Sequence, residues 1–488
     1  MPLNVGDTGY GSVDRPGLSA SGAAGNSETA ALFQLTGEEE QERRPMSKEA
    51  LEESAGGPAW RRLRCYLVVL FWLAWMAMLA TAVAIIVTSP RPVATPLAWW
   101  QKSLFFQLQP DLFTATPPGG SGVVDALCDQ LPYFKSLGIS ALILRGLFDP
   151  INATESGGRS GALPHVQHLL SESDRVGLKV LLDVCDVQLF GTREDETKEP
   201  LDATQHALRF WLGQGVVGFL ICDTDAAYTE ESLMLWRSIV EEFNKEDEER
   251  IVVVKQTREL LPPLRVSGQQ LNVTLVDVVL RSVLPDSPRL LSARQVAGAI
   301  ETHLQMAEDT WLGWMVGGKA PFDLRRLLLV LLMTLPGTPV VQYDQLDHAQ
   351  GGNGSKSSDF TEKFKLKRSI VALFSSLSHN RAREEALLFG SFTFLPFNDS
   401  SNATLSSPSS PPILAFLRSW GCVHFLVLLN TGSEPRGLDP AWEISLPEAG
   451  VFVASTAMDR LGAVTLHTLV LRPREAVVVK LFEPGNYS

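Results

Sequence analysis

Side chains with obvious reactivity are few in this sequence, and the most suggestive ones end two apolar runs. Asp183 lies in the run VLLDVC, and Cys222 and Asp223 end the run GFLICD. A carboxylate in such a place can serve as a general acid, a general base or a nucleophile, and a cysteine thiolate is a nucleophile. A reactive thiolate needs a neighbouring histidine or cation, and none lies near Cys222 in the sequence. We therefore expect Cys185 and Cys222 to be buried thiols without a catalytic role.

Eight short apolar runs predict the elements that position these side chains. Helical patterns separate the runs, for example at Val123–Leu137 and Ala293–Met306. Near-continuous apolar strands that alternate with helices are typical of a parallel sheet buried on both faces, most economically a (β/α)8 barrel. An open doubly wound sheet is the alternative, but no glycine-rich phosphate loop follows the first run. The runs are residues 104–109, 141–148, 180–185, 218–223, 251–257, 274–282, 311–316 and 338–343.

The pattern changes after the helical stretch at Phe364–Leu377. Apolar runs bounded by Gly, Pro, Asn and Ser, such as FGSFTFLPF and VHFLVLLNTG, are typical of antiparallel strands. The sequence therefore predicts a barrel over residues 99–375 and a C-terminal antiparallel β domain over residues 376–488.

Three of the runs resemble strand motifs of the α-amylase family of glycoside hydrolases. VGLKVLLDV is similar to that family's third strand, LRFWLGQGVVGFLICD to its fourth and LPGTPVVQY to its eighth. They occur in the family's order within residues 100–345. The resemblance implies a barrel that, in retaining glycosidases, carries a nucleophile and a general acid about 5–5.5 Å apart.

The positions that match the family's catalytic residues hold other side chains here. The nucleophile position is Cys222, and the general acid position is Gln256, a neutral amide. Asp183 is retained, but the Asn-His pair that follows it ends in Gln188, and the His-Asp pair after the seventh strand falls near Gly317. Loss of the acid–base groups on several strands indicates a barrel kept for its shape, so we expect no catalysis.

Neighbouring carboxylates leave one alternative open. Consecutive strand side chains face opposite ways, so we expect Asp223 to point out of the barrel mouth. Asp225 and Glu259 lie on predicted loops and would have to reach back to the mouth. The alternative is a membrane-anchored α-glucosidase that uses these substitute carboxylates.

An uninterrupted apolar stretch, Cys65–Val87, precedes the barrel. Its 23 residues extend about 34 Å as a helix, enough for a hydrocarbon core of about 30 Å. Three arginines within residues 61–64 flank its N-terminal side, against Arg91 alone near the other end. The positive-inside rule therefore predicts a single-pass type II membrane protein with a cytosolic N-terminus, the helix and its flanks occupying residues 61–90.

The N-glycosylation sequons all follow this stretch. Their placement agrees with a C-terminal region that passes through the secretory route and is glycosylated. The six acceptors are Asn152, Asn272, Asn353, Asn398, Asn402 and Asn486.

Composition narrows the remaining classes of protein. The formal charge of −13 argues against nucleic-acid binding. Residues 1–60 are rich in Gly, Ser and Glu with few aromatics, which predicts a disordered cytosolic tail. The sparse cysteines form no disulfide framework, and we predict neither a cofactor nor a metal site.

A short tail, one membrane helix and an amylase-like barrel without its carboxylates resemble the 4F2-type heavy chains of heteromeric amino-acid transporters. MSKEALEESAGGPAWRRLR before the apolar stretch and PRPVATPLAWW after it carry the likeness, which covers about residues 46–488. The resemblance implies a non-catalytic subunit that pairs with a multi-span light chain, brings it to the plasma membrane and stabilises it. It also implies association with integrin β subunits.

The anchor region bears on such a partner in two ways. Small side chains form a stripe that permits close helix packing in lipid, although alanine is common in any membrane helix. The heavy chains usually carry a cysteine just beyond the membrane that forms a disulfide with the light chain, whereas Pro92 stands at the matching position. We therefore expect non-covalent association, or a divergent paralogue with another role such as a cell-surface adhesion or receptor glycoprotein. The stripe comprises Ala74, Ala77, Thr81 and Ala84.

Overall fold

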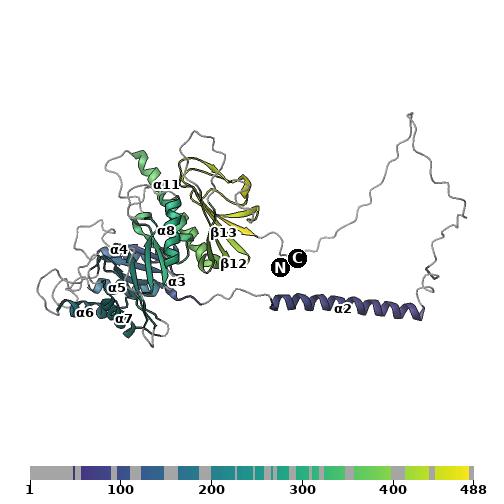
Figure 1. The fold of residues 1–488 in the computed structure, drawn as a ribbon, viewed down its shortest axis with the longest axis horizontal. Coiled ribbons are helices and arrows are strands. Elements are labelled where there is room, and N and C mark those ends of the chain that lie inside the picture. The colour runs from purple at the N-terminus through teal and green to yellow at the C-terminus, as the bar shows by residue number, and fades with distance from the viewer. Residues whose placement is uncertain are drawn as a thin grey trace, which may run out of the picture. The chain divides into compact units, whose positions relative to one another are not determined.

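The computed structural model (Figure 1) divides the chain into two compact units, Met1–Pro90 and Arg91–Ser488. The residues that it describes are 48–49, 57–88, 96–109, 122–147, 163–185, 199–225, 228–245, 248–257, 265–267, 272–284, 293–306, 310–317, 324–346, 357–396, 413–438 and 446–482.

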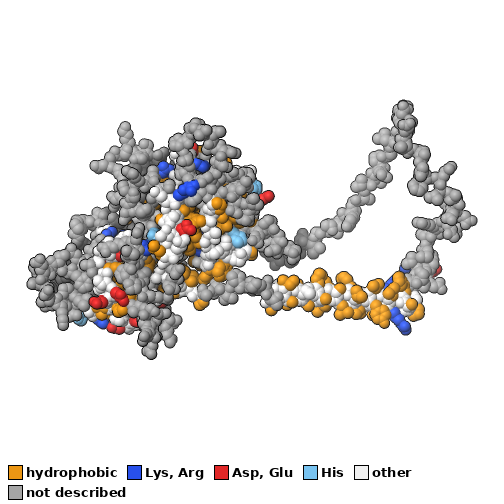
Figure 2. All heavy atoms as spheres, viewed as in Figure 1, with side chains coloured by type: hydrophobic (Ala, Val, Ile, Leu, Met, Phe, Trp, Pro, Cys, Tyr) orange, Lys and Arg blue, Asp and Glu red, His pale blue; other side chains and the backbone are white. Residues whose placement is uncertain are grey.

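Among its described residues, the first unit contains one long helix, α2 (Pro58–Thr88). It begins at a proline, whose fixed φ and missing N–H suit the first turn of a helix. Apolar side chains cover it, and basic ones lie at one end (Figure 2). The part Pro58–Ile85 is long and apolar enough to cross a membrane. This helix fits the predicted single-pass anchor.

The second unit is built around a closed barrel of eight parallel strands, in the neighbour order β1-β10-β9-β8-β5-β4-β3-β2 (Figure 1). Closure confirms the predicted (β/α)8 barrel and excludes the open sheet, because the first and last strands pair with each other. The strands are β1 (Phe105–Leu108), β2 (Ala141–Arg145), β3 (Lys179–Asp183), β4 (Gly218–Cys222), β5 (Ile251–Gln256), β8 (Val278–Ser282), β9 (Trp311–Met315) and β10 (Thr338–Gln342).

Helices cover the outside of the barrel. Apolar side chains at helical spacing, such as Leu127 and Leu131, pack with outward-facing strand residues such as Leu142 in one continuous core. These helices follow their strands in the chain and so occupy the crossover positions of a parallel sheet. They are α4 (Gly122–Ser136), α5 (Leu163–Val176), α6 (Glu199–Gly213), α7 (Glu230–Glu242), α8 (Ala293–Met306), α9 (Arg325–Thr334) and α10 (Tyr343–Leu346).

A small hairpin interrupts the alternation between β5 and β8. Strands β6 (Arg265–Ser267) and β7 (Asn272–Thr274) pair antiparallel, so the predicted run 274–282 is divided between β7 and β8. This hairpin is not predicted from the sequence, because its strands are only three residues each.

The C-terminal part is an antiparallel sheet in the order β11-β12-β13-β18-β15-β16, as the fold class predicts. Alternate side chains of the sheet pack into two different cores. Phe416 and Phe425 pack with the barrel helices, whereas Ala415 and Leu426 pack on the other face of the sheet. The sheet strands are β11 (Ser391–Phe394), β12 (Leu414–Trp420), β13 (Val423–Leu429), β15 (Ala449–Ser455), β16 (Ala463–Thr465) and β18 (Ala476–Phe482). The second core also contains residues next to β14 (Arg436–Gly437), η3 (Leu466–Thr468) and β17 (Val470–Leu471).

Two buried arginines, one from α11 and one from the sheet, bond to the end of α9. Arg381, on α11 (Ser357–Arg383), donates hydrogen bonds to the carbonyl oxygens of Met333 and Leu335 at 2.8 and 3.0 Å. Arg418, on β12, donates to the carbonyl oxygen of Thr334 at 3.0 Å. The last carbonyls of a helix lack intrahelical donors and carry negative partial charge, so both guanidinium groups stabilise this helix end. Burial lowers the pKa of Arg381 to about 10, and burial together with the Arg381 charge lowers the pKa of Arg418 to about 9.

Arg418 also reaches α12 (Glu385–Leu388), donating to the carbonyl oxygens of Leu387 and Gly390 at 2.9 and 3.0 Å. Barrel helices and sheet thus share both an apolar core and a polar junction. The domain boundary predicted between residues 375 and 376 lies inside α11.

We predict that Arg418→Met lowers the free energy of unfolding by about 3 kcal/mol or more, because the carbonyls that it serves lose a buried donor. Thermal unfolding of the purified chain, followed by circular dichroism, measures the loss. Arg175→Met is the control, since Arg175 is an exposed arginine paired only with its helix neighbour Glu172 in the interactions seen. Equal melting temperatures for the two variants would contradict the role given to Arg418.

Candidate functional site

The barrel interior is defined by alternate residues of each strand. Phe105, Leu181, Leu220 and Val253 form part of an apolar core that is separate from the core beneath the helices. Continuing this alternation by two residues leads to the carboxyl ends of the strands, the end at which barrel enzymes carry their active sites. The chemistry of this barrel therefore depends on the layer of interior-facing residues at that end.

A chain of polar side chains occupies part of this layer. Gln342 Nε2 donates to Gln107 Oε1 at 3.0 Å, and Gln107 Nε2 donates to Asp183 Oδ2 at 2.6 Å. The other carboxylate oxygen of Asp183, Oδ1, accepts from the backbone N–H of Cys185 at 3.0 Å. Asp183 is only 3% exposed, so its charge is held by neighbouring donors rather than by water. This bonding favours a structural role for the retained carboxylate.

The residue at the predicted nucleophile position is half of a disulfide. Cys222 pairs with Cys185, with their Cα atoms 4.9 Å apart. The expectation of two buried thiols is therefore wrong. In the register of β3 and β4, Asp183 lies beside Leu220, so two residues further on Cys185 and Cys222 lie side by side. A cysteine near the end of each of two neighbouring strands was the signal in the sequence, and it became readable only once the strand register was known.

The disulfide removes the one thiol that stood at a catalytic position. A sulfur in a disulfide is neither a thiolate nor a proton acceptor, so Cys222 cannot attack a sugar carbon or activate water. Among the described residues the remaining thiols are Cys65, Cys128 and Cys422. Burial, with lesser contributions from nearby carboxylates, raises the pKa of Cys128 to about 11, which keeps it protonated near neutral pH.

The fifth strand presents a cation rather than an acid to the interior. Ile251 and Val253 belong to the interior core, so Lys255 continues that face, and Cys222 is its partner in the register with β4. Gln256 follows on the opposite side of the strand and is 4% exposed. Its assignment as the emptied general-acid position remains a prediction. Neither side chain supplies a carboxylic acid.

Asp223 is buried just after β4 and is held by β5. Thr257 donates to its carboxylate from the backbone N–H at 2.8 Å and from Oγ1 at 2.7 Å. Burial, with the nearby Asp223 charge, raises the pKa of Tyr228 to about 12. Because Asp223 follows the interior-facing Cys222, it belongs to the opposite face, as the alternation predicts. Its contacts tie neighbouring strand ends together.

The seventh-strand position leaves no room for a catalytic side chain. A Cβ placed on Gly317 would collide with Ser282 Oγ and lie 2.8 Å from the Leu284 carbonyl oxygen. A histidine or aspartate there would require β8 and the loop after it to move. Asp225 lies in the turn after β4, whereas Gln188 and Glu259 lie outside the described residues.

The remaining predicted site residues lie on the membrane helix, on β7 or outside the described residues. The side chains of the small-residue stripe lie on α2, where Thr81 Oγ1 donates to the Met78 carbonyl at 2.8 Å. Asn272 begins β7. No group of three His, Cys, Asp or Glu side chains placed to hold a metal ion occurs in the part of the chain that the structure describes. Pro92 and the other five sequon asparagines, Asn152, Asn353, Asn398, Asn402 and Asn486, lie outside that part.

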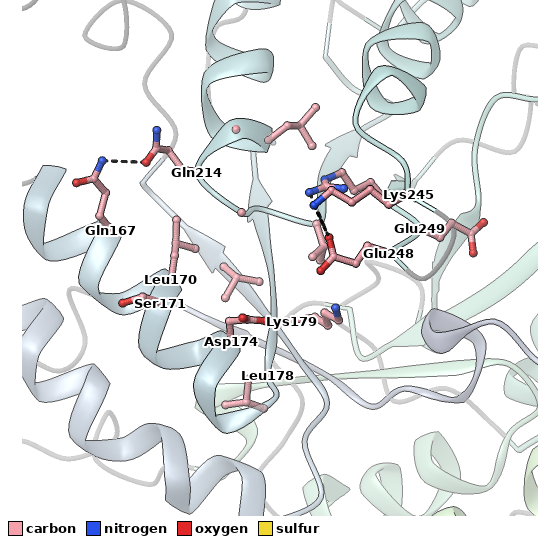
Figure 3. Close-up of a pocket in the computed structure, with 16 residues that line it drawn as sticks. Gln167, Leu170, Ser171, Asp174, Leu178, Lys179, Gln214, Lys245, Glu248 and Glu249 are labelled. Atoms are coloured by element: carbon pink, nitrogen blue, oxygen red, sulfur yellow. Dashed lines mark hydrogen bonds and ion pairs between the residues drawn. The ribbon is translucent and has the colours of Figure 1, made fainter.

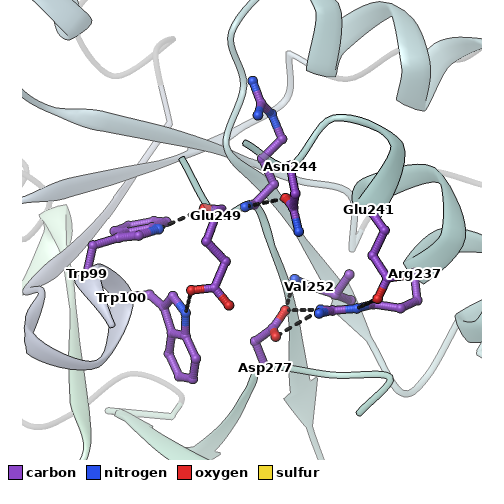
Figure 4. Close-up of polar contacts among 9 residues, drawn as sticks. Trp99, Trp100, Arg237, Glu241, Asn244, Glu249, Val252 and Asp277 are labelled. Carbon is purple, nitrogen blue, oxygen red and sulfur yellow. Dashed lines mark hydrogen bonds and ion pairs between the residues drawn. The ribbon is translucent and has the colours of Figure 1, made fainter. Parts of the chain in front are cut away.

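The amino end of the barrel is closed by α3 (Trp99–Lys102). The indole N–H groups of Trp99 and Trp100 donate to Glu249, at its carbonyl oxygen (2.7 Å) and at Oε2 (3.1 Å), as Figure 4 shows. Trp100 packs edge-on against Trp311, and its carbonyl accepts from Thr338 Oγ1 at 3.1 Å. This end of the barrel is therefore sealed by aromatic side chains.

A buried ion pair braces the same end. Arg237, on α7, donates from one guanidinium nitrogen to both carboxylate oxygens of Asp277 at 2.9 Å (Figure 4). Asp277 Oδ2 also accepts from the Val252 N–H at 2.8 Å, which ties α7 to β5 just before β8 begins. Both ends of the barrel are thus occupied by contacts that favour closure.

Comparison of the sequence with known proteins finds a family model and several relatives. The family described as Solute carrier family 3 member 2 N-terminus matches residues 34–106. The amino acid transporter heavy chain SLC3A2 of Rattus norvegicus is 27% identical over 98% of this chain and 95% of its own length. The protein of the same name from Oryctolagus cuniculus is 29% identical over 80% of this chain and 77% of its own.

The chain resembles the 4F2-type heavy chains of amino-acid transporters. Among solved structures, isomaltulose synthase from Erwinia rhapontici is similar, with a TM-score of 0.56 over 80% of this chain and all of its own. At 15% identity that likeness shows the fold alone. It agrees with the α-amylase-type barrel that the strand motifs predict.

We predict that maleimide labels three of the five cysteines in the denatured, unreduced chain and all five after reduction. Mass spectrometry of tryptic peptides counts the labels and should recover Cys185 linked to Cys222. Because the bond closes a loop with a sequence separation of 37, the Cys185→Ser/Cys222→Ser variant should lose about 3–4 kcal/mol of stability. Five labels before reduction would contradict the pairing.

Proposed function

We propose that this chain is a non-catalytic heavy-chain subunit of a heteromeric amino-acid transporter. It brings a multi-span light chain to the plasma membrane and stabilises it there. The observation that carries the proposal is the combination of a near full-length likeness to transporter heavy chains with a barrel mouth whose nucleophile position is a disulfide.

The chemistry of the mouth supports the absence of catalysis. Glycoside hydrolysis by retention needs two carboxyl groups that face each other about 5–5.5 Å apart. Of the carboxylates described at this end, Asp183 faces the interior and is bonded to Gln107, and Asp223 is bonded to Thr257 on the other face. Lys255 stands where the fifth strand would offer an acid to the interior. We infer that the barrel serves as a scaffold.

The membrane arrangement follows from α2 and its flanks. A helix that is exposed along its length in this structure and apolar on all sides needs lipid or a partner helix around it. The arginines at its start place the N-terminus in the cytosol and the barrel outside, where the six sequons are glycosylated. Ala74, Ala77 and Thr81 belong to the face that we propose packs on the light chain.

We predict that the purified chain does not release p-nitrophenol from p-nitrophenyl α-D-glucoside or glucose from maltose. The reason is the lack of a facing carboxyl pair among the described residues of the mouth. An α-glucosidase of the same fold is the positive control. Hydrolysis accelerated by about 10⁶-fold or more over the spontaneous reaction would overturn this part of the proposal. Loss of that activity in Asp225→Asn or Glu259→Gln would then identify a substitute carboxylate.

We predict that immunoprecipitation in mild detergent recovers a polytopic amino-acid permease with this chain. Because Pro92 replaces the linking cysteine, no reductant-sensitive band at the size of a heterodimer should appear, and Pro92→Cys should add one. An unrelated single-pass type II glycoprotein is the control bait, and probing for integrin β subunits tests the second implied partner. Recovery of no permease above the control bait would defeat the proposal.

A further inference from the structure

A cleft opens at the amino ends of β3, β4 and β5, the opposite end of the barrel from the mouth. Its volume is about 410 Å³, within the range of about 300–1,000 Å³ found for small-molecule sites. Helices α5 and α6 and the segment before β5 form its walls (Figure 3). Gln167 Nε2 donates to Gln214 Oε1 at 2.8 Å and joins the two helices at one side of the cleft.

One wall of the cleft is cationic. Arg250 has a side chain only 9% exposed, and its Nη2 lies 3.9 Å from Glu248 Oε2, which is beyond hydrogen-bond distance. Lys245 Nζ lies 3.5 Å from the same carboxylate, and Figure 3 shows Lys245 and Glu248 together on this wall. Glu249 also lines the cleft, but its Oε2 accepts from Trp100 Nε1 at 3.1 Å, and Figure 3 shows its side chain turned away from Lys245 and Glu248. Lys245 and Arg250 therefore share the Glu248 carboxylate, and this part of the wall suits a second carboxylate from a ligand.

The opposite wall carries Asp174, near the end of α5, and Lys179, both labelled in Figure 3. Lys179 Nζ lies over the Trp99 ring, 6.0 Å from its centroid, whereas the Asp174 carboxylate points into the cleft. The C-terminal end of α6, at Gly213, also lines the cleft, and a helix C-terminus carries negative partial charge. An ammonium group fits this wall, because both the carboxylate and the helix end attract a cation.

We propose that this cleft binds a small zwitterion of the free α-amino acid class. The ligand carboxylate meets Arg250 and Lys245, and its ammonium group meets Asp174. None of the described lining residues is aromatic, which disfavours a sugar or a nucleobase, since these ligands stack on aromatic rings. The walls are polar and partly open to water, so binding is weak, with a dissociation constant of about 1 mM.

The test is isothermal titration calorimetry of the full chain in detergent with L-alanine and L-glutamine, at up to about 10 mM. Acetate and methylammonium, which carry one charge of the zwitterion each, are titrated at the same concentrations. The proposal requires saturable binding of at least one amino acid and at least tenfold weaker binding of either half alone. Acetate that binds as tightly as the amino acids would overturn it in favour of a simple anion site.

Two variants locate the site. Asp174→Asn and Lys245→Met each remove one charge from opposite walls and should weaken amino-acid binding about tenfold, the size expected for a lost charged hydrogen bond. Glu172→Gln is the matched control on the same helix, since Glu172 is bonded to Arg175 and does not line the cleft. Absence of saturable binding by the unaltered chain, or equal binding by all three variants, would overturn the proposal. Because the chain is titrated alone, the outcome is independent of whether a light chain binds.

Discussion

An eight-stranded parallel barrel is stable only when the side chains that point inward fill its interior. Other side chains must also cover or bond to the groups at both of its ends. Here Phe105, Leu181 and Leu220 belong to the packed interior. At the amino end, Trp100 and Trp311 close the barrel. At the carboxyl end, hydrogen bonds and a disulfide join neighbouring strand ends. The contacts that complete the fold therefore engage Asp183 and Asp223, two carboxylates at the described strand ends, in hydrogen bonds.

This constraint explains how a barrel of this type can remain stable if, as we propose, it carries out no catalysis. Catalytic carboxylates at a barrel mouth are costly for the fold, because they bring like charges close together in a partly buried site. A disulfide between β3 and β4 and the bonded amides bring no such repulsion to these strand ends, and the disulfide links neighbouring strands covalently. We infer that the barrel is retained as a stable external scaffold, attached to the membrane by one helix. The two arginines that join α11 and β12 to the end of α9 extend this stability to the C-terminal part.

Much of the fold could be predicted from the sequence, because buried parallel strands are near-continuous apolar runs and all eight runs became barrel strands. The site was less predictable, since it depends on the register between strands. Neither the pairing of Cys185 with Cys222 nor the interior position of Lys255 follows from one strand alone. The crowding at Gly317 likewise arises from Ser282 on a neighbouring strand. The β6–β7 hairpin has too few apolar residues to be predicted from the sequence.

The central claim is that this chain acts through a membrane partner rather than through its own barrel mouth. The most direct measurement is sodium-independent and sodium-dependent amino-acid uptake, together with surface biotinylation of polytopic permeases, in cells that lack the chain. The account predicts that uptake and surface permease both fall and that re-expression of the full chain restores them. Unchanged uptake and unchanged surface permease after deletion would contradict it.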